Sequence, residues 1–153
     1  MGIFSGVMAL PLAGIADPLQ PFPGSTYVSA EFNDADSFQV RLKDGDQVEV
    51  IRLYFVDSPE TSLSSESDRR RVLEQARYFG LEDPRDVIDF GKDAREFMEK
   101  QLKKPFTVYT AFARAQGRSQ KPRIYAMVKT DEGADLATLL VENGLARAKG
   151  IGR

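Results

Sequence analysis

A hairpin between residues 37 and 56 sets the first constraint on the fold. Residues 37–42 alternate between apolar and polar side chains, and residues 48–56 are rich in β-branched and aromatic ones, so both runs predict β-strands. The turn between them, residues 43–46, is Lys-Asp-Gly-Asp, and its Asp-Gly pair favours the positive φ angles of a tight hairpin turn. The chain is therefore expected to build an antiparallel sheet with short connections.

The same patterns predict three further strands and three helices. The further strands are expected at residues 26–32, 106–112 and 123–129. The helices are expected at residues 67–79, 84–104 and 136–142. In chain order this gives three strands, a helical region, two strands and a helix, which is the layout of the five-stranded OB fold. We therefore predict an α+β chain with a five-stranded antiparallel OB-fold β-barrel and packed helices, rather than a doubly wound parallel sheet.

The first residues leave two alternatives open. Residues 1–16 carry no charge and many apolar side chains, but Gly and Pro interrupt them and they are too few to span a membrane. They are either the remnant of a secretory signal, with a small-residue cleavage site at residues 14–16, or an ordinary apolar arm. A signal remnant predicts a secreted or periplasmic protein, and an apolar arm leaves a cytoplasmic protein as the alternative.

Proline and charge patterns suggest how the chain is divided. Three prolines within residues 17–24 predict a stiff linker that joins neither a sheet nor a helix. The expected division is an arm and linker at residues 1–24 and one domain at residues 25–153, with an inserted helical segment around residues 62–85. Three successive arginines in that segment, residues 69–71, are interpreted as a solvated face, with a substrate or partner contact as the alternative.

Composition narrows the possible chemistry. The chain contains no histidine and no cysteine, which excludes a Ser-His-Asp triad, a thiolate nucleophile and a zinc finger. Acid–base chemistry must then fall to Asp, Glu, Lys or Tyr, and a metal site must be built from oxygen ligands. Residues 1–99 hold 10 Lys and Arg against 19 Asp and Glu, whereas residues 100–153 hold 11 against 4. Such a distribution suits a polyanion held beside a carboxylate cluster, although chance segregation of solvated charge is the simpler interpretation.

Carboxylates gather where the hairpin strands begin and end. Asp57 and Glu60 follow the second strand of the hairpin, and Asp36 precedes the first strand. Because the start of one antiparallel strand lies beside the end of the next, Asp36 and Asp57 are expected to be neighbours. Two adjacent carboxylates repel each other unless a cation lies between them, so these residues predict an oxygen-ligand site. Calcium could be held there by both carboxylates, the carbonyl oxygen of Ser58 and water. On this hypothesis, Asp57→Asn should stabilise the metal-free protein by removing the repulsion.

Four segments resemble one known family. Residues 52–61 read R-L-Y-F-V-D-S-P-E-T, close to the R-L-x-x-V-D-[ST]-P-E-T signature of the staphylococcal nuclease (thermonuclease) family. Residues 34–37 are similar to that family's D-G-D-T segment, with Ala in place of Gly. Residues 123–128 resemble the strand that the family's second catalytic arginine opens, and residues 136–146 resemble its V-x-x-G-L-A helix. The family fold is the OB barrel, in agreement with the order of elements.

The resemblance implies roles for individual residues. Asp36, Asp57 and the carbonyl oxygen of Ser58 would hold calcium. Glu60 would orient or deprotonate the attacking water. Arg52 and Arg123 would bind the scissile phosphate and stabilise its charge, with Arg118 as the alternative to Arg123.

Two functions follow from the sequence. The first is a monomeric, calcium-dependent nuclease that hydrolyses DNA, RNA or both, without stable insertion into a membrane. The second is a catalytically silent OB module of the same family that binds nucleic acid or protein. The joint presence of the three acidic residues and the two arginines favours the nuclease, because a binding module has no need of the carboxylates.

Overall fold

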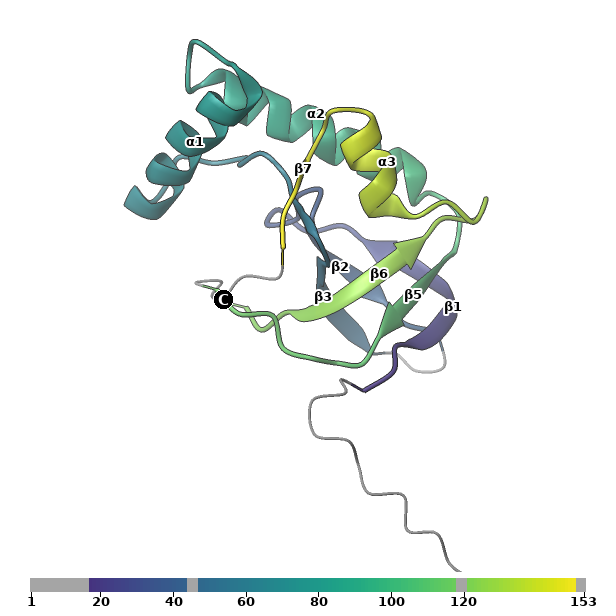
Figure 1. Ribbon diagram of the computed structural model, residues 1–153. Coiled ribbons are helices and arrows are strands. Elements are labelled where there is room, and N and C mark those ends of the chain that lie inside the picture. Colours follow the sequence, from purple (N-terminus) through teal and green to yellow (C-terminus); the bar gives the residue numbers. More distant parts are fainter. Residues whose placement is uncertain (1–16, 44–46, 118–120, 151–153) are drawn as a thin grey trace, which may run out of the picture.

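Five strands close into a barrel in the computed structural model, which describes residues 17–43, 47–117 and 121–150 (Figure 1). In their order around the barrel, the strands are β1 (Gln20–Val28), β2 (Ser37–Arg41), β3 (Val48–Leu53), β6 (Ile124–Lys129) and β5 (Phe106–Thr110). Four of the five pairings are antiparallel, and β3 pairs parallel with β6, with Ile51 opposite Ile124. The fold is therefore the predicted α+β OB barrel, with one parallel pairing closing it.

Apolar side chains fill the barrel because every second residue of a strand faces inward. In β2, Phe38 and Val40 are fully buried, and in β3 Ile51 and Leu53 are buried beside them. The hairpin pairing predicted from the sequence joins these two strands over five residue pairs, from Ser37 opposite Arg52 to Arg41 opposite Val48. The predicted turn at residues 44–46 lies outside the described residues.

The first strand corrects the prediction for the proline segment. β1 begins at Gln20, so Pro21 and Pro23 belong to the sheet, although a linker was expected there. Residues 20–22 pair with β5 alone, and β2 joins β1 only from Thr26 onward. A proline on the side of a strand that has no partner removes no ladder hydrogen bond, which is how this segment accommodates it. The apolar residues 1–16 lie outside the described residues.

The long strand predicted at residues 48–56 is in fact two strands. β3 ends at Leu53, and the chain turns through Tyr54 and Phe55, whose φ angle is +66°. A two-residue strand, β4 (Val56–Asp57), then leaves the barrel and pairs with another two-residue strand, β7 (Arg147–Ala148). This turn breaks the alternation of the barrel strand, and it directs Asp57 toward the C-terminal segment.

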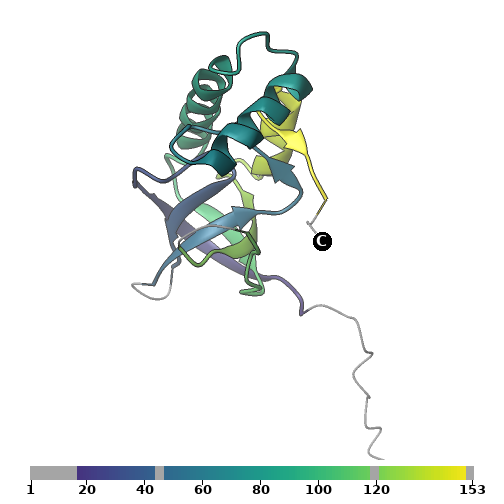
Figure 2. The ribbon, with the colours of Figure 1, turned by 90° about the vertical axis from the view of Figure 1, so that its left-hand side faces the viewer.

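Three helices cover one end of the barrel (Figure 2). They are α1 (Glu66–Phe79), α2 (Asp86–Gln101) and α3 (Leu136–Glu142). Helix α1 begins one residue before its predicted start, after a capping box formed by Ser65 and Asp68, and ends at Gly80 in the left-handed conformation. Helix α2 buries Ala94 and Met98 in the barrel core, whereas its first turn packs Val87 against α1. Within the described ranges, none of these helices is long and apolar enough to cross a membrane.

Candidate functional site

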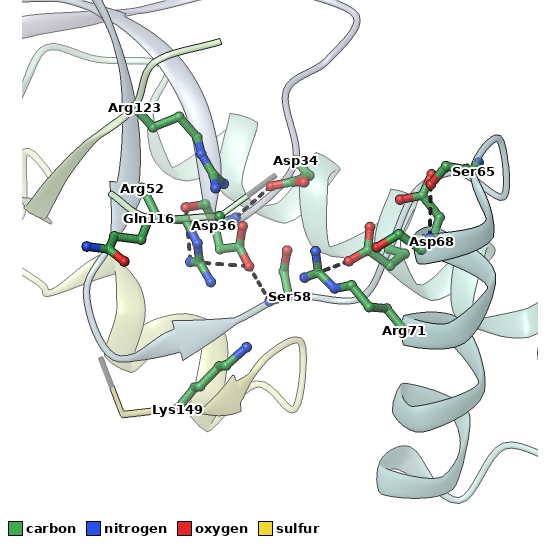
Figure 3. Close-up of a pocket in the computed structure, with 13 residues that line it drawn as sticks. Asp34, Asp36, Arg52, Ser58, Ser65, Asp68, Arg71, Gln116, Arg123 and Lys149 are labelled. Carbon is green, nitrogen blue, oxygen red and sulfur yellow. Dashed lines mark hydrogen bonds and ion pairs between the residues drawn. The ribbon is translucent and has the colours of Figure 1, made fainter. Parts of the chain in front are cut away.

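A polar pocket of about 340 Å³ lies between the barrel and helix α1 (Figure 3). Its walls come from the start of β2, the end of β3, the loop after β4, helix α1, the loop before β6 and the segment after β7. The lining residues include Asp34, Asp36, Arg52, Ser58, Glu60, Ser65, Ser67, Asp68, Arg71, Gln116, Gly117, Arg123 and Lys149. Five of the six predicted site residues therefore line one pocket, and the sixth, Asp57, is buried directly behind it.

Asp36 is held at the start of β2 by a local turn. The Oδ1 atom of Asp34 accepts the backbone N–H groups of Ser37 at 2.9 Å and Asp36 at 3.3 Å. The Asp36 carboxylate in turn accepts the backbone N–H of Ser58 at 2.6 Å. The start of β2 and the residues after β4 are thus in contact, as the antiparallel pairing predicted. Loss of solvent, followed by the charge of Asp36, raises the pKa of Asp34 well above its ordinary value.

Arg52 forms ion pairs with both predicted metal-ligand carboxylates, Asp36 and Asp57. Its Nη1 atom lies 3.3 Å from Oδ2 of Asp36, and its Nη2 atom lies 3.5 Å from Oδ1 of Asp57. Only 14% of the Arg52 side chain is exposed, so both ion pairs are largely shielded from water. One guanidinium group therefore occupies the space beside both carboxylates and faces the pocket.

Asp57 is fully buried and has cations on several sides. Its cationic neighbours are Arg147 Nε at 2.9 Å, Arg71 Nη2 at 3.3 Å, Arg52 Nη2 at 3.5 Å and Lys149 Nζ at 3.9 Å. Burial raises the pKa of the Asp57 carboxyl, but the charges of Lys149, Arg71 and Arg147 outweigh burial and hold the pKa below its ordinary value. The expectation that Asp57→Asn stabilises the metal-free protein is therefore reversed, because attraction to cations dominates at this carboxylate.

Ser58 presents a different oxygen from the one predicted. Its carbonyl oxygen accepts a hydrogen bond from Nε2 of Gln75 at 3.0 Å. Its hydroxyl oxygen is buried and has no hydrogen-bond partner among the described residues. A buried polar atom without a partner is costly, and at the wall of a polar pocket it points to a ligand or a water molecule.

The residues around Ser58 suit a hard cation, although they do not form a complete cage. Among the described residues, no three carboxylate side chains gather closely enough to hold a metal ion. Two carboxylates, Asp36 and Asp57, flank Ser58, and its unpartnered hydroxyl adds a third oxygen. This incomplete oxygen set fits calcium, which takes its remaining ligands from water or substrate.

Glu60 reaches the pocket from the loop after β4. Its backbone N–H donates to Oε1 of Gln75 at 2.8 Å, and its carboxylate pairs with Nη2 of Arg71 at 2.7 Å. Burial is the largest cause of a raised pKa at Glu60. The charge of Arg71 opposes it, but burial together with the charges of Asp36 and Asp57 raises the pKa to about 7. A carboxylate with a pKa near neutrality is suited to exchange a proton with a bound water molecule.

Gly91 of helix α2 lies directly against the loop that carries Glu60. A Cβ atom at this position would lie 2.8 Å from the carbonyl oxygen of Pro59 and closer still to that of Glu60. Replacing a helical glycine with alanine ordinarily stabilises a protein by about 0.5–1 kcal/mol. Here we expect Gly91→Ala to lower the free energy of unfolding by about 1–3 kcal/mol, because the loop has to move. Urea denaturation measures the change, and a stabilised variant would contradict this close packing.

Arg123 stands next to Arg52 at the barrel side of the pocket. Its Nη1 atom lies 3.4 Å from Oγ of Ser37, and no carboxylate lies within ion-pair distance of it among the described residues. Burial, together with the like charge of Arg52, lowers the pKa of Arg123. Arg52 is paired with two carboxylates, but the guanidinium group of Arg123 has none among the described residues and is therefore suited to bind an anion. The alternative residue, Arg118, lies outside the described residues.

Helix α1 contributes two site residues that the sequence analysis missed. Gln75 is 1% exposed and holds the loop after β4 through Asp57, Ser58 and Glu60. Arg71 was interpreted as one of three solvated arginines, with a substrate or partner contact as the alternative. The helical period could have separated it from the other two, since Arg71 adjoins Val72 and lies one turn before Gln75, both of which α1 buries. Arg147 and Lys149 carried no comparable signal, because two-residue strands have no recognisable pattern.

Comparison with protein families identifies a match over most of the chain. A family model described as staphylococcal nuclease homologue matches residues 50–152, which is more than half of the chain. None of the curated proteins matches the chain. The matched segment contains Arg52, Asp57, Glu60 and Arg123, whereas Asp36 precedes it.

Proposed function

Because the chain belongs to the family of staphylococcal nuclease homologues, as its motifs predicted, we propose that it is a calcium-dependent nuclease that hydrolyses phosphodiester bonds of DNA or RNA. One observation carries the proposal. Arg52, Arg123, Asp36 and Glu60 converge on a single open pocket, with Asp57 and the Ser58 hydroxyl at its wall. A phosphodiester needs cationic donors for its oxygens, a place for a cation and a base for water, and this pocket contains groups suited to all three.

The proposed calcium ligands are Asp36, Asp57 and Ser58. Calcium bound there would supply positive charge to a substrate phosphate. The protein's own part is to hold the two carboxylates close together, which Arg52 does by pairing with both. A nucleic-acid strand can reach Asp36 and Ser58 because both line an open pocket, and Asp57 is buried behind them.

The arginines and Glu60 have distinct proposed roles. Arg52 and Arg123 donate hydrogen bonds to the non-bridging oxygens of the scissile phosphate, where negative charge increases as water attacks. Glu60 accepts the proton of that water, and its raised pKa suits this task near neutral pH. The water oxygen bonds to phosphorus as the bond to the leaving oxygen breaks. None of these roles requires histidine or cysteine.

The function is tested with heat-denatured DNA and a matched variant. The wild-type protein is expected to hydrolyse the DNA with calcium and to stop when a chelator is added. Arg123→Ala, purified in the same way, is expected to be slower by about 10²–10³-fold, as for the loss of one donor to a developing oxyanion. Gel electrophoresis of the products measures both.

Two outcomes would contradict the nuclease. Equal hydrolysis by wild type and Arg123→Ala would identify a contaminating enzyme. Binding of an oligonucleotide without hydrolysis under any calcium condition would support the alternative, a silent OB module. One observation favours that alternative. Arg71 pairs with both Glu60 and Asp57, and it thereby neutralises two carboxylates that the hydrolysis reaction would use.

A further inference from the structure

Arg71 brings a cation to the pocket from the side opposite the barrel arginines. It projects from helix α1 toward Ser58 and Asp36, whereas Arg52 extends from β3 and Arg123 from the residue before β6 (Figure 3). Its Nη2 atom lies 2.7 Å from Oε1 of Glu60 and 3.3 Å from Oδ1 of Asp57. The side chain is nevertheless 47% exposed, against 14% for Arg52, so solvent and ligands can reach it.

Much of the Arg71 guanidinium group makes no hydrogen bond to the described residues. Both ion pairs involve Nη2, and neither Nη1 nor Nε has a hydrogen-bond partner among the described residues. A guanidinium group carries five N–H donors in a planar fork that matches the oxygens of a phosphate. Donors that face an open anion-binding pocket and have no protein acceptor are therefore available to a phosphate.

Within the described part of the chain, Asp57 has three cationic neighbours besides Arg71. Arg147 and Arg52, each about 15% exposed or less, already lie 2.9 Å and 3.5 Å from its carboxylate, and Lys149 lies 3.9 Å away. Arg71 comes from helix α1, whereas the other cations come from β3 and the β7 segment. Neutralisation of Asp57 is therefore shared among four cations, and the half-exposed side chain of Arg71 remains within reach of a ligand in the pocket.

We propose that Arg71 binds a backbone phosphate of the substrate, so that helix α1 and the barrel hold the strand from opposite sides. The proposal rests on the proposed function, because the ligand is a nucleic-acid strand. It assigns to the segment around residues 62–85 a direct part in substrate binding. The competing explanation is that Arg71 only neutralises Glu60 and positions it.

The test measures equilibrium binding of a single-stranded oligonucleotide in chelator, so that no hydrolysis occurs, over a range of salt concentrations. Arg71→Ala is expected to weaken binding by at least about tenfold, as for the loss of a charge-assisted hydrogen bond. It should also reduce the salt slope, log K against log salt concentration, by about 0.7, the value for one lost phosphate contact on a single strand. Arg70→Ala is the matched control, because it removes the same charge from the neighbouring exposed position of α1. It is expected to retain the wild-type slope.

A double variant separates the two explanations. In a Glu60→Gln background, Arg71→Ala should still weaken binding and still reduce the slope if Arg71 contacts phosphate. If Arg71 acts only through Glu60, it should have no further effect there, and that result would overturn the proposal. Equal affinities and slopes for Arg71→Ala and Arg70→Ala would overturn it too. No binding by the wild type would instead count against the proposed function. Melting curves verify that each variant is folded, and Arg71→Gln replaces Arg71→Ala if the latter is not.

Discussion

Replacing Glu60 with glutamine is expected to lower the single-turnover rate of phosphodiester hydrolysis by at least about a hundredfold, the lower end of what a general base contributes. The side chain is 14% exposed, lines the pocket and keeps its shape in the variant, so only the charge and the capacity to accept a proton are lost. Binding of an oligonucleotide should change by no more than a few fold. Rapid-mixing cleavage assays on saturated enzyme measure the rate.

A second readout separates catalysis by Glu60 from a structural role. Its folded-state pKa of about 7 lies above the ordinary value of 4.5, so its contribution to stability is fully present below pH 4.5 and is lost as the pH rises to 7. The free energy of unfolding of metal-free Glu60→Gln should therefore equal that of the wild type at pH 4 and exceed it by up to about 3 kcal/mol at pH 8. If Glu60 merely paired with Arg71 and supported the turn, the variant would be less stable at pH 8 and would cleave at the full rate.

Asp57→Asn is expected to lower the free energy of unfolding of the metal-free protein by about 3–5 kcal/mol, the usual cost of removing one partner of a buried ion pair. Its carboxylate is fully buried, and the substitution leaves Arg147 and Arg52, both mostly buried, without their shared counter-charge. Denaturant titration at pH 7 measures the loss.

The pH dependence of the free energy of unfolding provides a second check on this prediction. The pKa of Asp57 is depressed, so the stability it contributes is present above the ordinary value of 3.8 and is lost as the pH falls through the lower, folded-state pKa. The difference between wild type and variant should shrink in acid. Asp36→Asn is the matched control, because Asp36 has Arg52 as its one cationic partner within ion-pair distance among the described residues. Its loss of stability should be smaller, and an Asp57→Asn variant as stable as wild type would refute the electrostatic account.

The barrel and the contact between Asp36 and the residues after β4 could be predicted because they depend on local patterns. Alternation over residues 37–42 and antiparallel pairing bring Asp36 beside the end of β3, but the turn at Tyr54 and Phe55, after which the chain reaches Ser58 and its contact with Asp36, was not predicted. Short pairings such as β4 with β7 carry no periodic signal, so the cations that β7 brings to Asp57 were not foreseen. Proline in β1 was misinterpreted because its effect depends on whether a strand has one neighbour or two.

The part of the site that lies on helix α1 was harder to predict for a different reason. Which face of a helix is buried can be estimated from its own sequence, but what that face contacts cannot. Gln75, which is 17 residues further along the chain, donates a hydrogen bond to the carbonyl oxygen of Ser58. Ser58 lines the pocket as predicted, but its hydroxyl is the oxygen that has no partner among the described residues.

In the proposed nuclease, Asp36 and Asp57 together hold the cation that the reaction uses. Calorimetric titration of calcium into the wild type, Asp36→Asn and Asp57→Asn, each shown by circular dichroism to be folded and each saturated with a nucleoside diphosphate, tests this claim most directly. The wild type is expected to bind one calcium ion, and both variants are expected to lose most of that affinity, since each lacks one of two carboxylate ligands. Calcium binding of wild-type affinity in both variants would contradict the claim.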